Sequence, residues 1–133
     1  MKAKQFPYVA NENSPLMAET ERELNDFLRE IQFRDVQYSG VSGINTRNKP
    51  YVTGMVLVQY EDGSPKPEEI VQMKQFPLGT SDSFREPTHK TLNDFLASQD
   101  VKDMKYTAVS GRNEVGEEFV TGLALVVYSP TQK

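Results

Sequence analysis

Cysteine is absent from this chain of 133 residues, and histidine occurs once. The lack of cysteine excludes disulfides, thiolate zinc sites and cysteine nucleophiles. No stretch approaches the roughly 18 consecutive apolar residues of a membrane-spanning helix, and the N-terminal sequence MKAKQFPYVANEN lacks the apolar core of a signal peptide. We therefore expect a cytoplasmic protein that has no membrane partner.

Positive charge is also in short supply, since 15 Lys and Arg residues stand against 19 Asp and Glu residues, a formal net charge of -4. A protein that neutralises many phosphates normally carries a basic excess, so we expect no nucleic acid polymer as partner. A small anionic ligand remains compatible with this balance, because a few placed cations suffice to bind it.

Residues suited to catalysis are few. His89 has Glu21 at its repeat position, and we interpret it as a surface residue, with a ligand contact as the alternative. Two carboxylate pairs could do acid-base chemistry, but solvation or capping explains them more simply: Asp26 with Asp94, and Asp35 with Asp103. No EF-hand spacing occurs. We expect no catalytic residue, no metal site and no cofactor, and hence a protein that is not an enzyme.

An internal repeat dominates the sequence. A shift of 68 positions places Thr20–Tyr60 on Thr88–Tyr128 without a gap, with 18 of the 41 aligned residues identical. The segment KQFP at Lys4–Pro7 recurs at Lys74–Pro77 with a shift of 70. The duplication therefore covers nearly the whole chain.

Each copy predicts the same order of elements. A short strand at KAKQFP precedes a helix that we expect to begin near Thr20, and near Thr88 in the second copy, with apolar residues at helical spacing. The segment FRDVQYSGVSG then alternates as a half-buried strand does. The apolar run YVTGMVLVQY suits a central strand covered on both faces, and a polar turn before it indicates a hairpin.

These elements predict an α+β fold of two tandem β-α-β-β modules. The first module spans 1–60, a linker spans 61–69, the second module spans 70–129 and a tail spans 130–133. One helix covers only one face of an apolar sheet, so we expect the modules to pack as one domain about a pseudo-twofold axis, with an antiparallel or mixed sheet. Further copies of the chain would cover what remains, as in a homo-oligomer.

Two pentapeptides are the candidate binding site: VSGIN at Val41–Asn45 and VSGRN at Val109–Asn113. One interpretation is purely structural, since Gly, Asn and Ser suit turns. The other is that both copies point polar groups from strand ends at one ligand. In this second hypothesis the ligand accepts or donates hydrogen bonds at Ser42, Asn45, Ser110 and Asn113. Its phosphate charge is compensated by Arg47, Lys49 and Arg112, and a base stacks on Tyr38 or Tyr106.

The modules resemble a known family. A KQF strand, LNDFL closing a helix, VKDMKYTAVS and GLALVVY are similar to the short Bacillus sporulation proteins of roughly sixty residues that have phage relatives. Copy two fits better, since Gln37 stands in copy one where the pattern has Lys. The resemblance implies a small non-enzymatic β-α-β-β protein. A second likeness, of type and not of motif, is to phage anti-defence proteins that sequester cyclic nucleotide immune signals.

Two functional hypotheses follow. The first is a phage-type anti-defence protein of the host cell cytoplasm that sequesters a cyclic nucleotide or cyclic ADP-ribose-type signal without turning it over. The alternative is a protein-interaction module that regulates or inhibits a host protein through a sheet edge or the acidic helix face Glu19–Glu30. An enzyme acting on nucleotides ranks below both.

Overall fold

The structure is a computed structural model that describes residues 1–8, 15–44, 50–78, 82–112 and 118–130. Two helices, six strands and one short 3-10 helix follow one another in this part of the chain. Their order is β1 (Lys2–Tyr8), α1 (Pro15–Leu28), β2 (Gln32–Ile44), β3 (Pro50–Glu61), η1 (Pro67–Glu69), β4 (Gln72–Leu78), α2 (Asp82–Ser98), β5 (Asp100–Arg112) and β6 (Glu118–Ser129). The predicted order β-α-β-β therefore occurs twice.

The strands form two three-stranded antiparallel sheets. The first sheet has the order β1-β3-β2 and the second has the order β4-β6-β5. The predicted α+β fold with antiparallel sheets is confirmed. The third strand of each module lies in the centre, as its apolar sequence predicts, while the first and second strands form the two edges.

The repeat extends to the packing of individual rings. In the first module Phe27 of α1 lies 5.4 Å from Phe6 and 4.9 Å from Tyr60 between ring centroids, and its contact with Tyr60 is edge-on at 88°. The second module reproduces this cluster: Phe95 lies 5.0 Å from Phe76 and 5.1 Å from Tyr128 between ring centroids, and its contact with Tyr128 is edge-on at 87°. Aromatic clusters of this geometry contribute beyond the area they bury, so each helix is held on its own sheet in the same way.

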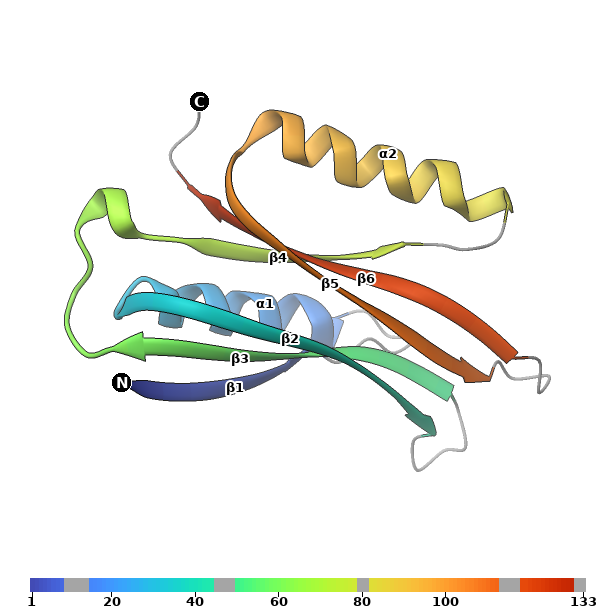
Figure 1. Cartoon of the computed structure of the whole chain (residues 1–133), viewed down its shortest axis with the longest axis horizontal. Coiled ribbons are helices and arrows are strands. Elements are labelled where there is room, and N and C mark those ends of the chain that lie inside the picture. The colour runs from blue at the N-terminus through green and yellow to red at the C-terminus, as the bar shows by residue number, and fades with distance from the viewer. Residues whose placement is uncertain (9–14, 45–49, 79–81, 113–117, 131–133) are drawn as a thin grey trace.

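The elements stack in four layers: the first sheet, α1, the second sheet and α2 (Figure 1). Helix α1 shares a core with both sheets. This core joins Leu24 and Leu28 of the helix with Val56 of the first sheet and Leu125 of the second. Helix α2 covers the opposite face of the second sheet through a smaller core around Leu92 and Val126.

The two modules are consequently covered to different extents. The central strand β6 is buried on both faces, and Leu125 is 0% exposed. In β3 the repeat position Leu57 is 36% exposed, so the prediction of cover on both faces holds for the second copy only. A twofold axis would give both modules the same contacts. The described contacts depart from that relation, because α1 lies between the sheets and α2 lies outside them.

The helices begin earlier than predicted. Helix α1 begins at Pro15 and α2 at Asp82, and not near Thr20 and Thr88. Proline suits the first turn of a helix because its fixed φ is already helical and its missing N–H has no intrahelical acceptor there. Pro15 is thus the start signal that the sequence analysis missed. In α2, Pro87 lies inside the helix, and the Thr91 hydroxyl donates a 2.9 Å hydrogen bond to its carbonyl.

Candidate functional site

The repeated tyrosines lie across glycines of the central strands. A Cβ built on Gly54 would come within 2.6 Å of the Tyr38 ring, and one built on Gly122 would come within 2.7 Å of the Tyr106 hydroxyl. Only glycine leaves room for a ring to lie flat on the neighbouring strand. The repeat of Val-Thr-Gly therefore has a packing cause, which the sequence analysis did not identify.

The environments of the two tyrosines differ. Tyr38 is partly buried against the core, and its hydroxyl donates a 2.5 Å hydrogen bond to Oε1 of Gln75 in the other module. Burial raises the pKa of Tyr38 above its ordinary value. Tyr106 is 63% exposed. Of the two tyrosines proposed for base stacking, Tyr106 thus presents the open ring face, and Tyr38 takes part in the contact between modules.

Strands β2 and β5 cross closely where the pentapeptides begin. A Cβ on Gly40 would collide with Cγ2 of Val109 and would come within 3.1 Å of Cγ2 of Thr107. Glycine at this position allows the two backbones to approach. The two Val-Ser-Gly copies therefore begin close to one another, since Val41 follows Gly40 and Ser110 follows Val109.

The Val-Ser-Gly part of each pentapeptide belongs to a strand. Gly43 is paired with Tyr51 and Gly111 with Phe119 in the antiparallel ladders. The turn interpretation therefore does not account for these three residues. Ser110 is exposed on β5.

Several of the candidate residues cannot be placed as side chains. The backbones of Ser42 and Arg112 lie in β2 and β5, but their side chains fall outside the described part. Four further candidates lie outside the described residues altogether: Asn45, Arg47, Lys49 and Asn113. Tyr106 and Ser110, both on β5, are the candidates whose exposed side chains the structure describes.

The repeated aspartates have a structural use. Asp35 and Asp103 each accept a hydrogen bond of 2.8 Å from the backbone N–H of the following residue, at the irregular position of their strand. This local bond gives the N–H group a side-chain acceptor directly after the bulge. Asp94 pairs with Lys90 at 2.7 Å on the exposed surface of α2. Each of these three carboxylates therefore has a local contact that explains it without chemistry.

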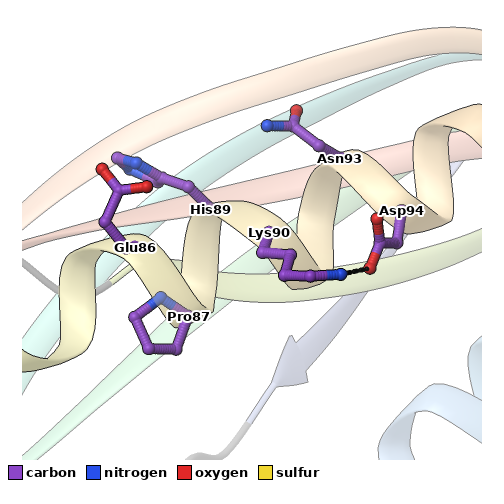
Figure 2. A pocket seen from close by; sticks show the side chains of 6 residues that line it. All are labelled: Glu86, Pro87, His89, Lys90, Asn93 and Asp94. Carbon is purple, nitrogen blue, oxygen red and sulfur yellow. Dashed lines mark hydrogen bonds and ion pairs between the residues drawn. The ribbon is translucent and has the colours of Figure 1, made fainter.

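His89 lies on the outer side of α2, in an open hollow whose six lining residues all belong to that helix (Figure 2). Glu86 and Asn93 extend to the same side as His89, and the other lining residues include the ion pair of Lys90 with Asp94. Within the described residues no group of three or more potential metal ligands occurs. No helix in the described part is long and apolar enough to cross a membrane.

No protein-family model, no curated protein and no solved structure matches the chain. The resemblance to the sporulation proteins therefore stays a prediction from the motifs.

Proposed function

We propose that this protein binds and sequesters a small anionic ligand of the cyclic nucleotide or cyclic ADP-ribose class without converting it, as a phage-type anti-defence protein in the host cytoplasm would. The close crossing of β2 and β5 at Gly40 carries the proposal. From this crossing both strands run toward the same end of the molecule, so the two repeated Val-Ser-Gly segments lie near one another (Figure 1). A ligand with two phosphate or ribose groups would contact both copies of the pentapeptide.

The exposed residues of β5 supply two suitable groups. Tyr106 offers a ring face for stacking a base, a contact that contributes about 1–3 kcal/mol. Ser110 offers a hydroxyl for a phosphate oxygen, and a hydrogen bond to a charged group contributes about 1.5–3 kcal/mol. Loss of either group would therefore weaken the binding of such a ligand about fivefold or more.

Isothermal titration calorimetry with cyclic dinucleotides and cyclic ADP-ribose tests the proposal. We expect saturable heat with one of these compounds and weaker binding by Tyr106→Ala and Ser110→Ala. Ser64→Ala, an exposed serine outside both sheets, serves as the matched control and should bind like the wild type. Absence of heat with every compound would refute the proposal, and slow consumption of a bound compound would favour an enzyme instead.

The protein-interaction alternative is supported by the surface of α1. Glu19, Glu23 and Asp26 are exposed, while Glu21 and Asn25 of the same helix contact the second module. The predicted acidic face is therefore open to a basic partner. A host protein that is retained stoichiometrically by the wild type, and lost with Glu23→Lys, would favour this alternative over sequestration.

A further inference from the structure

The contact between the two modules joins two different surfaces. We define the donor surface of the first module by Asn25, Val36 and Tyr38. Side-chain Oδ1 of Asn25 accepts a 2.7 Å hydrogen bond from the backbone N–H of Met73, and its Nδ2 donates a 3.1 Å bond to the Met73 carbonyl. Tyr38 donates to Gln75 at 2.5 Å. One helix residue thus satisfies both the N–H and the C=O of Met73 on the free edge of β4.

The surface that receives these groups lies on the second module. We define this recipient surface by Met73, Gln75 and Leu125. Gln75 and Leu125 are opposite one another in the ladder between β4 and β6, and Met73 is opposite Val127, so all of them share one face of the sheet. Val36 of the donor surface and Met73 and Leu125 of the recipient surface are each 0% exposed.

The duplication repeats both surfaces, and the second copies of both are exposed. The donor surface recurs on the second module as Asn93, Met104 and Tyr106, and the recipient surface recurs on the first module as Ala3, Gln5 and Leu57. Apart from Met1, the large apolar side chains that are exposed among the described residues are Leu57 at 36%, Met104 at 45% and Tyr106 at 63%. Each of these three is the duplicate of a residue in the contact between modules.

We propose that copies of this chain associate head to tail, with the donor surface of one copy on the recipient surface of the next. Ala3 has the same ladder position in β1 as Met73 has in β4, so its N–H and C=O point away from the sheet and are open to the Asn93 amide of another copy. Tyr106 then donates to Gln5. Because the two surfaces differ, association does not close at two copies but continues to a ring or a filament.

Charge on the two surfaces agrees with this partner. Within the chain, Nζ of Lys74 lies 3.9 Å from Oε1 of Glu21 in α1. Lys4 is the repeat of Lys74 on β1, and on α2 the repeat of Glu21 is His89. The acidic Glu86 extends to the same side of α2 as His89 and Asn93 (Figure 2), so a negative charge is still available to Lys4. Complementary charge of this kind steers association and sets orientation.

One position makes the contact between copies looser than the contact within the chain. At the crossing of β2 and β5, Gly40 lies against Val109 and Thr107, and a Cβ there would collide with Val109. The repeat of Gly40 is Ala108, which has that Cβ and would come against β2 of the next copy. The two strands therefore have to stand further apart between copies. Ala108→Gly removes this obstacle and should strengthen self-association.

Sedimentation velocity over a range of about 5 to 500 µM tests the proposal directly. We expect the wild-type mass to rise with concentration past that of a dimer. Tyr106→Arg, which blocks the donor surface, and Leu57→Asp, which blocks the recipient surface, should each be monomeric. Glu68→Lys, an exposed charge change in η1, is the control and should associate like the wild type. Circular dichroism checks that every variant is folded.

Mixing the two blocked variants distinguishes head-to-tail association from a symmetric dimer. Each variant keeps one intact surface, so an equimolar mixture should form a dimer and nothing larger. A wild type that is monomeric throughout the range would overturn the proposal. It would also be overturned by a wild type that stops at a dimer, or by a mixture of blocked variants that stays monomeric. The experiment needs no ligand, so its outcome is independent of the proposed function.

Discussion

Replacing Asn25 by alanine would measure how strongly α1 is attached to the second sheet. The substitution removes the 2.7 Å and 3.1 Å hydrogen bonds to the N–H and C=O of Met73. Met73 is fully buried, so water does not readily replace the amide. A lost intramolecular hydrogen bond costs about 1 kcal/mol, and a buried group left unpaired costs about 1–3 kcal/mol. Alanine returns about 0.5 kcal/mol through its better helix propensity. We expect a net loss of about 2 kcal/mol.

The repeat supplies a matched control for this measurement. Asn93→Ala makes the same substitution in the same sequence context, LNDFL, but Asn93 is exposed. It should keep only the gain in helix propensity, so its free energy of unfolding should be unchanged or higher by about 0.5 kcal/mol. Urea denaturation at low protein concentration, where the chain is not associated, gives both values from the midpoint shift at constant m.

A third variant separates the two hydrogen bonds. Asn25→Asp keeps an oxygen that accepts from the Met73 N–H but has no group that donates to the Met73 carbonyl. The free energy of unfolding of Asn25→Asp should lie between that of the wild type and that of Asn25→Ala. Equal losses for Asn25→Ala and Asn93→Ala, or a loss for Asn25→Ala below about 0.5 kcal/mol, would show that this amide does not hold α1 on β4.

Other substitutions test the remaining packing and charge. Leu125→Ala should cost about 2–5 kcal/mol in urea denaturation, whereas Leu57→Ala at the repeat position should cost less than about 1 kcal/mol, and equal costs would contradict the unequal cover of the sheets. Gly40→Ala should lower the melting temperature, because its Cβ collides with Val109, and an unchanged value would contradict the close crossing. Burial raises the pKa of Glu21 above 4.5, with Lys74 opposing the shift, so the folded chain binds more protons in the window just above pH 4.5. Wild-type stability should therefore fall as pH rises through that window, and Glu21→Gln should lack this slope; equal slopes would refute the assignment.

The sequence predicts the elements well because the two copies can be checked against each other. The alternation in FRDVQYSGVSG and the apolar run after it correspond to β2 and β3, and the same segments 68 positions later correspond to β5 and β6. Both periodicities come from local geometry, since strand side chains alternate and helix side chains recur every three to four residues. Local signals therefore determine the fold class of each module.

The environment of each module is not a local property and could not be predicted. LNDFL occurs in both copies, yet Asn25 binds an edge strand and Asn93 is exposed. The difference arises because α1 has a sheet on each side and α2 has one sheet only. The candidate site has the same limit: Tyr38 and Tyr106 are identical in type, and only the three-dimensional structure distinguishes the one in the module contact from the exposed one.

The two copies of the recipient surface differ in sequence in the way that their burial differs: the copy on the second module is covered by the first module, and the copy on the first module is exposed. Where the second module has Met73 and Val127, both buried, the first module has Ala3 and Gln59. The smaller and more polar residues bury less apolar area when a partner docks, so a contact between copies is weaker than the contact within the chain. The modules of one chain are also joined by a short connection, which gives the internal contact an effective concentration of about the millimolar range or higher. Two chains have no such advantage. Head-to-tail association should therefore be reversible and dependent on protein concentration.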